Sequence, residues 1–297
     1  MSELHIVTVA TESKYYFPYL MKSCKRHGKE LEVLGFGEIW KGFNWRFKLM
    51  IDYLNKLPKD DIVCFVDGYD VLCVRDLNEI KKKFLEIRNK SGCEIIIGIN
   101  EFDKNNYIYN YAYYLYFGKC NNSYINAGVY IGYAKELLKV ISEIHKINNK
   151  DDADDQVLIT EYCNKSNINI YIDTKFELFL SILCPLIEID KYLEISEDKI
   201  INYKSNQPFF IHANGYGYLD GTIKKLGYPI ELNKIKNELF YNFLEKKIFL
   251  YLFMILKNNI VLIILIIILF FFLFYINNNY KKIIKKLKFS KKIKKII

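Results

Sequence analysis

The stretch IVCFVDGYDVL (residues 62–72) decides the fold of this chain. Its first five residues are apolar and mostly β-branched or aromatic, which is typical of a strand buried on both faces of a sheet. An acidic turn that contains Asp67 and Asp70 follows directly. A buried strand that runs into a polar turn indicates an open α/β sheet, in which ligands bind outside the carboxyl ends of the strands.

Short apolar strands alternate with amphipathic segments on both sides of this stretch. We expect further strands at residues 4–10, 31–37, 94–100 and 124–133, and helices at residues 16–27, 43–57, 77–88, 134–148 and 155–164. This alternation predicts an α/β domain with a mostly parallel central sheet flanked by helices. There is no Pro/Gly-rich linker inside it, so we expect one domain over residues 1–245.

Charge is divided unevenly along the chain. There are 43 Lys and Arg residues against 34 Asp and Glu residues, a formal net charge of +9. Ten lysines lie at or after residue 257, where there is no acidic residue, so residues 1–256 hold 33 basic and 34 acidic groups. The body of the protein is therefore nearly neutral, which disfavours nucleic acid as a partner.

The last part of the chain has a different character. Residues 260–276 are a run of 17 uncharged residues, at the short end of what spans a bilayer. We expect a single-pass transmembrane helix there, after an apolar or interfacial connector at 246–259 and before a Lys-rich tail at 277–297 that attracts anionic lipid. This predicts a membrane protein with a C-terminal anchor and leaves the side of the membrane open.

The seven cysteines give no pattern. They are Cys24, Cys64, Cys73, Cys93, Cys120, Cys163 and Cys184. No two of them have CxxC spacing, so neither a zinc finger nor a disulfide framework is indicated. Because most lie in apolar runs, we interpret them as small core residues, which favours a reducing compartment.

Two signals at strand ends point to a metal site. Asp67 and Asp70 can share a divalent cation through their carboxylate oxygens. His212, in FFIHANG (209–215), follows a short apolar strand and is expected to emerge at a strand end as well. A histidine with two aspartates can make a facial metal site that leaves positions for phosphate oxygens. A solvated Asp-Gly turn and a histidine that only makes hydrogen bonds stay open as alternatives.

Further carboxylates are candidates for acid–base chemistry. Asp154 and Asp155 lie in DDADDQ (151–156), which is either a solvated helix start favoured by the helix dipole or a catalytic group facing a cleft. Glu101 comes directly after the strand at 94–100 and is another strand-end carboxylate. Any of the three can act as a general base on a hydroxyl group.

Small and amide residues mark two places where a ligand can approach the backbone. Asn126 stands beside Ala127 and Gly128 in the middle of a strand, which indicates either a bulge or a ligand lying on the backbone. Asn214 and Gly215 follow the histidine at the end of another strand, where glycine permits a close approach.

Several short motifs occur in an order that resembles the glycosyltransferase domain of procollagen lysyl hydroxylase/glycosyltransferases and the related collagen galactosyltransferases. In chain order they are IVTVAT (6–11), WRFK (45–48), FVDGYDVL (65–72), INAGVYIGYA (125–134), DDQ (154–156), IHANG (211–215) and YLDGTIKKLGYPI (218–230). The resemblance covers about residues 4–230. It implies a GT-A-type fold and a UDP-sugar donor bound with Mn²⁺.

The resemblance also implies roles for individual residues. It implies metal ligands at Asp67, Asp70 and His212, and catalytic or acceptor-side carboxylates at Asp154, Asp155 and Glu101. On the donor side it implies nucleotide contacts at Thr8, Tyr69 and Trp45, a sugar contact at Asn126, and a diphosphate loop at Asn214 and Gly215.

Two departures from the family pattern affect the donor side. Ala153 interrupts the acidic run where the family usually has Asp. After His-x-Asn-Gly the family commonly has Pro-Thr-Lys, but this chain has Tyr216, Gly217 and Tyr218, so a phosphate-binding lysine is missing unless Lys224 or Lys225 replaces it. No hydroxylase domain is expected after residue 245, and we therefore expect no lysyl hydroxylation.

These observations predict a metal-dependent glycosyltransferase that moves galactose or glucose from UDP-galactose or UDP-glucose to a hydroxyl group of a protein or glycan. Hydroxylysine of a collagen-like protein is the acceptor that the resemblance implies. Two alternatives stay open: a phosphohydrolase that acts on nucleotide sugars, and a degenerate, membrane-tethered module that binds UDP without turnover. UDP-sugar hydrolysis with and without an acceptor distinguishes the enzymes.

Overall fold

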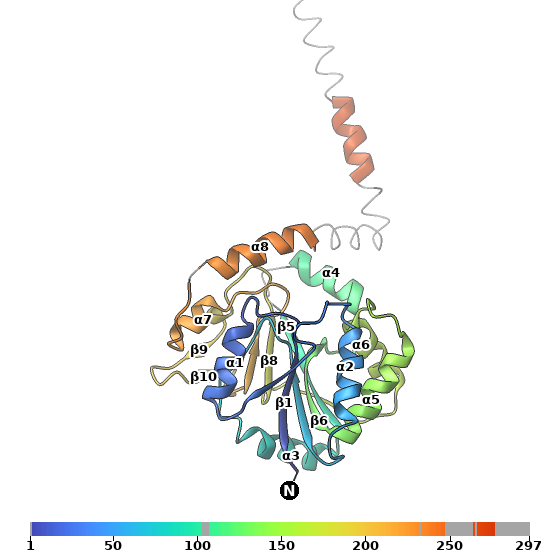
Figure 1. Ribbon diagram of the computed structural model, residues 1–297. Coiled ribbons are helices and arrows are strands. Elements are labelled where there is room, and N and C mark those ends of the chain that lie inside the picture. Colours follow the sequence, from blue (N-terminus) through green and yellow to red (C-terminus); the bar gives the residue numbers. More distant parts are fainter. Residues whose placement is uncertain (1, 103–106, 232, 247–263, 265, 277–297) are drawn as a thin grey trace, which may run out of the picture. The chain divides into compact units, whose positions relative to one another are not determined.

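A computed structural model describes residues 2–102, 107–231, 233–246, 264 and 266–276 (Figure 1). The chain divides into two units, Met1–Ile248 and Phe249–Ile297. The first unit holds every candidate site residue.

The helices and strands of the first unit include all those that the sequence alternation predicts, together with others that it does not. They are β1 (Leu4–Val9), α1 (Phe17–Arg26), β2 (Leu31–Leu34), α2 (Trp45–Leu54), β3 (Ile62–Val66), β4 (Val71–Cys73), α3 (Ile80–Ser91), β5 (Ile95–Phe102), α4 (Tyr107–Phe117), β6 (Ile125–Tyr133), α5 (Ala134–Ile147), α6 (Asp155–Lys165), β7 (Ile170–Ile172), β8 (Phe179–Leu183), a 3₁₀ turn (Ile189–Lys191), β9 (Glu194–Ile195), β10 (Ile201–Asn202), β11 (Phe210–His212), α7 (Asp220–Lys225) and α8 (Lys234–Lys246).

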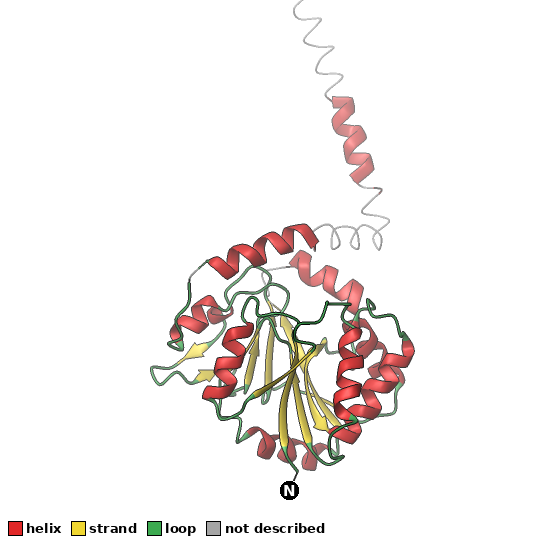
Figure 2. Cartoon of the chain, in the orientation of Figure 1, coloured by secondary structure: helices red, strands yellow, loops and turns green. Residues whose placement is uncertain are grey.

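A central sheet with helices on both faces forms the body of this unit (Figure 2). Its strand order is β2-β1-β3-β6-β5-β8-β11-β4, and β7 pairs with β5. β1 is parallel to β2 and β3, and β8 is parallel to β5 and β11. β6 runs antiparallel between β3 and β5. The predicted α/β architecture with a mostly parallel sheet and flanking helices is confirmed.

The core explains why β3 is apolar at every position. All five of its residues are buried. Val63 and Phe65 pack with residues of α2, α5 and α6 on one face, whereas Ile62, Cys64 and Val66 pack with residues of α1 and α3 on the other. Alternate side chains of a strand point to opposite faces, so a strand covered on both faces needs an unbroken apolar sequence.

The stretch 62–72 contributes two strands rather than one. β3 ends at Val66, the acidic turn follows, and β4 begins at Val71. β3 pairs with β1 and β6, whereas β4 pairs antiparallel with β11 at the other edge of the sheet. The turn between them therefore joins an inner strand of the sheet to an edge strand.

The cysteine interpretation needs a correction at two positions. Five cysteines are free and buried, as expected for small core residues: Cys24, Cys64, Cys73, Cys93 and Cys184. Cys120 and Cys163 instead form a disulfide with a Cα–Cα distance of 6.0 Å across a sequence separation of 43 residues. The sequence gives no sign of it because partners so far apart meet only in the folded chain.

In the second unit, the structure describes Ile264 and a helix at residues 266–276. The large apolar side chains of this helix are 46–67% exposed. Among the residues that the structure describes, no helix is long and apolar enough to cross a membrane. The transmembrane helix expected at 260–276 is thus not supported, while the expected connector from residue 247 and the Lys-rich tail lie outside the described residues.

Candidate active site

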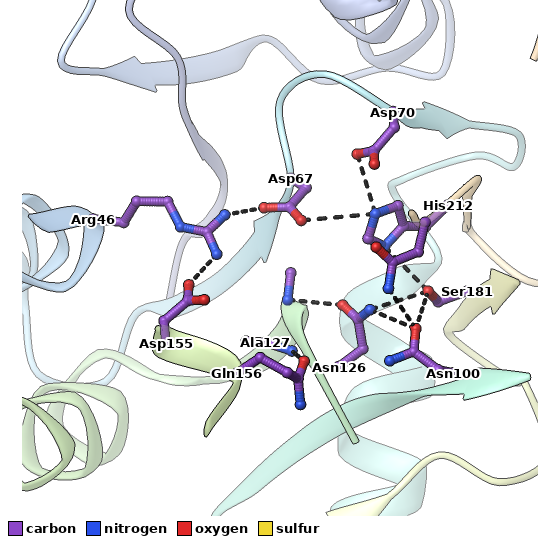
Figure 3. A network of polar contacts seen from close by, with 12 residues as sticks. Arg46, Asp67, Asp70, Asn100, Asn126, Ala127, Asp155, Gln156, Ser181 and His212 are labelled. Atoms are coloured by element: carbon purple, nitrogen blue, oxygen red, sulfur yellow. Dashed lines mark hydrogen bonds and ion pairs between the residues drawn. The ribbon is translucent and has the colours of Figure 1, made fainter. Parts of the chain in front are cut away.

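Three side chains implied as metal ligands lie together. Asp67 follows β3, Asp70 precedes β4 and His212 ends β11. Because β11 pairs with β4, with His212 opposite Val71, the histidine lies beside the turn that carries both aspartates. One ligand atom from each of the three lies within 4.8 Å of the other two, and Figure 3 shows the side chains pointing toward one another.

Asp67 has room for its carboxylate because the facing residue of β6 is a glycine. The Asp67 N–H donates to the carbonyl of Gly128 at 2.8 Å. A Cβ on Gly128 would lie 2.6 Å from Asp67 Cγ, a distance at which one of the two must move. The small residue in the middle of this strand is therefore explained by the close approach of the carboxylate.

His212 is buried and faces both carboxylates. Its Nε2 lies 3.1 Å from Asp70 Oδ1 and 3.7 Å from Asp67 Oδ2. The carboxylates do not align with the ring N–H direction, so Nε2 is a buried nitrogen without a hydrogen-bond partner. Burial by itself lowers the pKa of His212, but Asp70 and then Asp67 outweigh it, and the pKa is raised above 6.5.

A buried arginine connects this cluster to the acidic run. Arg46, in the first turn of α2, forms ion pairs with Asp67 and Asp155 (Figure 3). Burial opposes the charge of Arg46, yet the two carboxylates raise its pKa above the ordinary value. Burial also raises the pKa of Asp155, to about 6, against the attraction of Arg46. Asp155 is thus a buried carboxylate beside Arg46 with a pKa above the ordinary value.

The two implied catalytic aspartates have different surroundings. Asp154 is the N-cap of α6, and its Oδ1 accepts from the N–H groups of Gln156 and Val157 at 3.0 and 3.2 Å. Asp155 is 3% exposed and faces Arg46. Gln156 bonds the backbone of β6 on either side of Asn126 and so fixes the helix start to the strand.

A network of amides lies on the other side of His212. Asn100 Oδ1 accepts from Asn126 Nδ2 at 2.8 Å, from Asn214 Nδ2 at 2.8 Å and from Ser181 Oγ at 3.0 Å. Ser181 Oγ also lies 3.2 Å from His212 Nδ1. The structure therefore brings Asn126 and Asn214 beside the cluster of Asp67, Asp70 and His212, and Gly215 follows Asn214 with a φ of 74° that suits glycine.

Glu101 lies on the opposite face of the sheet from this network. It follows Asn100 on β5, and successive side chains of a strand point to opposite faces. The Glu101 carboxylate pairs with Lys204 Nζ at 3.1 Å, and Lys204 lies over the rings of Phe176 and Tyr203. The structure does not bring this carboxylate to the cluster of Asp67, Asp70 and His212.

The implied nucleotide contacts are only partly accessible. Trp45 is 3% exposed and packs in the core, whereas its edge-on neighbour Trp40 is 39% exposed. Thr8 is fully buried, and its Oγ1 has no hydrogen-bond partner. Tyr69 lies beside the cluster, where its hydroxyl accepts from the N–H of Thr11 at 3.0 Å. Trp45 is therefore not placed to stack on a ligand.

Sequence reasoning missed three residues of this site: Arg46, Asn100 and Ser181. Each carries the same signal, a polar residue among buried neighbours. Arg46 lies on the buried face of α2. Asn100 is a buried amide in the apolar strand β5, and Ser181 is the single polar residue of β8 (FLSIL). Buried polar groups need partners, so such positions indicate a polar network.

These residues fit a divalent cation. Two carboxylates and an imidazole are common ligands of divalent metals. The buried His212 Nε2 lacks a hydrogen-bond partner, and Gly128 leaves space for the carboxylate of Asp67. Arg46 pairs with Asp67, and Asp155 pairs with Arg46. The arrangement can hold a cation next to a buried acid–base group.

Fold and site define a class: an α/β domain with a carboxylate–histidine cluster at the carboxyl ends of its strands. The family follows from comparison with known proteins. Residues 1–237 match the family described as the PLOD GT domain. The chain belongs to this family, so the resemblance found in its motifs is confirmed.

Relatives with established names span the same region. A multifunctional procollagen lysine hydroxylase and glycosyltransferase of Caenorhabditis elegans is 30% identical over 72% of this chain and 31% of that protein. Its human counterpart LH3 is 25% identical over 72% and 30%, respectively. A solved glycosyltransferase involved in glycosylation of the major capsid of PBCV-1 covers 75% of this chain and 97% of its own, with 11% identity and a TM-score of 0.45. The chain matches less than a third of the length of the two named relatives.

Proposed function

We propose that this protein is a metal-dependent glycosyltransferase that moves a hexose from a UDP-sugar to a hydroxyl acceptor. The observation that carries the proposal is the convergence of Asp67, Asp70 and His212 at the carboxyl ends of the strands. Family membership supports the transferase part of the proposal. UDP-galactose and UDP-glucose are the proposed donors, and Mn²⁺ is the proposed cation.

The three ligands would hold the cation where it meets the diphosphate of the donor. When bound, the cation would neutralise the negative charge that develops on the leaving UDP. Asn214 and Gly215 come two and three residues after His212, so their amide and backbone groups are proposed to contact the diphosphate. Lys225, a candidate for the missing phosphate contact, is paired with Asp190 at 2.9 Å.

Asp155 is the proposed general base. In the reaction the acceptor oxygen bonds to the sugar, the bond from the sugar to UDP breaks, and the acceptor proton must be removed. Asp155 is buried beside Arg46 and Asp67, and its pKa of about 6 keeps it ionised at neutral pH. Asp154 is already the helix cap. A protein or glycan hydroxyl, including hydroxylysine of a collagen-like protein, is the proposed acceptor.

The test is release of UDP by the full chain, purified in detergent, with a panel of UDP-sugars and with or without Mn²⁺. The proposal predicts Mn²⁺-dependent release from UDP-galactose or UDP-glucose that increases when an acceptor is added. Release that is equal with and without acceptor would favour the phosphohydrolase. UDP binding without any release would favour the degenerate module.

Membrane attachment through the C-terminal region is a separate proposal. The helix at 266–276 is apolar on all sides, and nine lysines follow it in the sequence. Vesicles of phosphatidylcholine and phosphatidylserine test it by flotation. The full chain is expected to float with the vesicles, and a chain without residues 260–297 is expected to stay below them. Equal behaviour of the two would contradict the attachment.

A further inference from the structure

The His212 ring has two nitrogens with different surroundings. Nε2 faces Asp67 and Asp70 and has no hydrogen-bond partner. Nδ1 lies 3.2 Å from Ser181 Oγ on the neighbouring strand, where His212 is in register with Ser181. A neutral imidazole can bind a cation through Nε2 only if its proton is on Nδ1. The partner of Nδ1 therefore decides whether the ring presents a lone pair to the cluster.

The direction of the hydrogen bonds can be followed from a backbone group. The Gly128 N–H can only donate, and it donates to Asn126 Oδ1 at 2.7 Å. This fixes the orientation of the Asn126 amide, so its Nδ2 donates to Asn100 Oδ1 at 2.8 Å and to Ser181 Oγ at 3.1 Å. Asn100 Oδ1 is thus an acceptor.

The Ser181 hydroxyl has one proton to place. It donates to Asn100 Oδ1 at 3.0 Å, because this amide oxygen can only accept, whereas His212 Nδ1 can carry the proton of its own pair with the hydroxyl. Ser181 Oγ already accepts from Asn126, and its second lone pair faces His212 Nδ1. The hydroxyl therefore accepts from Nδ1–H. A proton on Nε2 would lie 3.1 Å from Asp70 Oδ1 without hydrogen-bond geometry, whereas a proton on Nδ1 has Ser181 Oγ as its acceptor.

We propose that Ser181 is a positioning residue whose hydroxyl, oriented by Asn100, holds the His212 proton on Nδ1 and keeps Nε2 available to a divalent cation. The inference rests on the proposed metal site and deepens it. The hydroxyl takes the place of the carboxylate or carbonyl that commonly orients a metal-binding histidine. Figure 3 shows the chain of contacts from Asn126 through Asn100 and Ser181 to His212.

Mn²⁺ affinity of the full chain, measured by the loss of the free-ion electron paramagnetic resonance signal, tests the proposal. Loss of an orienting partner of a metal-binding histidine typically weakens binding about 10- to 100-fold. Ser181→Ala is expected to weaken Mn²⁺ binding by this factor, and Ser181→Thr, which keeps the hydroxyl, is expected to restore most of it. Affinity in Ser181→Ala equal to that of the native chain would overturn the proposal.

Asn100 supplies a second pair of variants. Asn100→Asp keeps an oxygen acceptor for Ser181 and is expected to bind Mn²⁺ at least as tightly as the native chain. Asn100→Leu removes that acceptor, so the Ser181 proton can turn to Nδ1, and binding is expected to weaken as in Ser181→Ala. Equal affinity of the two Asn100 variants would contradict the relay through Asn100.

A matched control separates folding from positioning. Ser23→Ala removes an equally buried hydroxyl, which contacts Leu20 and Cys73 in the core around α1. Thermal unfolding is expected to shift similarly in Ser23→Ala and Ser181→Ala, whereas only Ser181→Ala loses Mn²⁺ affinity. Loss of affinity in both variants would show a general effect of destabilisation and overturn the assignment.

The tautomer itself is measurable without the metal. The chain has four histidines, so the ¹⁵N signals of His212 can be assigned by their loss in His212→Gln. In neutral His212 the native chain is expected to carry the proton on Nδ1, and Ser181→Ala is expected to show a mixture. If the native chain binds no Mn²⁺, the proposed metal site fails, while this measurement still decides the role of Ser181. A proton on Nε2 in the native chain would refute that role.

Discussion

Two clusters of one histidine and two carboxylates lie at opposite ends of β3. Asp61 precedes the strand and meets Glu3 and His5, whereas Asp67 follows it and meets Asp70 and His212. The residue types do not distinguish the two clusters, but their hydrogen bonds do.

At the first cluster both ring nitrogens of the histidine have partners. His5 Nδ1 lies 2.7 Å from Glu32 Oε1, and Nε2 lies 3.3 Å from Asp61 Oδ2. Asp61 Oδ1 accepts from the Glu3 N–H at 2.7 Å, and Glu32 accepts from the Tyr53 hydroxyl at 2.7 Å. Both nitrogens of His5 and both carboxylates therefore have hydrogen-bond partners, as in a structural ion-pair network.

At the second cluster one ring nitrogen of the histidine has no hydrogen-bond partner. His212 Nδ1 meets a neutral hydroxyl, and Nε2 faces two carboxylates without a hydrogen bond. A buried ring nitrogen without a hydrogen-bond partner therefore distinguishes a candidate cation site from a salt bridge of the same residue types.

The largest effect is expected for Asp67→Asn. The variant keeps the size of the side chain beside Gly128 but removes a charged ligand and the partner of Arg46. UDP release from the donor sugar is expected to fall at least about 1,000-fold, since one ligand and one preorganised charge are lost together. Activity within about tenfold of the native chain would remove Asp67 from the metal site.

Asp155→Asn is expected to have the next largest effect. Loss of a general base typically costs about 100- to 10,000-fold in rate. Because Asp155 contacts Arg46 and is not one of the converging ligands, Mn²⁺ affinity is expected to stay within a few-fold of native. Loss of Mn²⁺ binding with the activity would contradict this division of roles.

The same carboxylate sets a pH dependence. A base must be deprotonated, and burial raises the pKa of Asp155 to about 6. Activity is therefore expected to be low at acidic pH and to rise as the pH passes through about 6. A bound cation favours the ionised carboxylate, so the rise is expected at this pH or at a lower one when the cation is present. A rate profile in the native chain that is flat across this range would argue against Asp155 as the base.

A smaller effect is expected for Gly128→Ala. The new Cβ would meet the Asp67 carboxylate and displace it, so we expect Mn²⁺ affinity to fall by about 10-fold or more. Gly132→Ala on the same strand is the control, because its Cβ would meet Ile95 and Leu137 in the core. Both variants are expected to lose about 1–3 kcal/mol of stability in urea unfolding. Only Gly128→Ala is expected to lose Mn²⁺ affinity.

The smallest effect on activity is expected for Asp61→Asn. It weakens contacts to His5 and to the Glu3 N–H, so the free energy of unfolding is expected to fall by about 1 kcal/mol. Mn²⁺ binding and UDP release are expected to be unchanged. A clear loss of Mn²⁺ affinity in this variant would show that the comparison between the two clusters is wrong.

The fold was largely predictable because its elements have strong local signals. The unbroken apolar run of β3 and the helix that starts after Asp154 lie where the sequence predicts them. The antiparallel direction of β6 was not predictable, because pairing depends on the path of the chain between strands. The aromatic residues of α4 lack a clear helical period, so the sequence does not predict this helix.

The candidate site was predictable to a lesser degree. Motifs predicted that Asp67, Asp70 and His212 converge, because a strand end fixes where the next side chains emerge. They did not distinguish Glu101 from Asn100, since a shift of one residue on β5 turns a side chain to the other face. They also missed Ser181, whose role depends on a neighbour 31 residues later in the sequence.

The measurement that tests the central claim most directly is a Mn²⁺ titration of the native full chain and of the variants Asp67→Asn and Asp61→Asn. The account predicts one bound Mn²⁺ per native chain, no specific binding in Asp67→Asn, and native affinity in Asp61→Asn. Binding that survives Asp67→Asn but is lost in Asp61→Asn would place the metal at the other end of β3 and contradict the account.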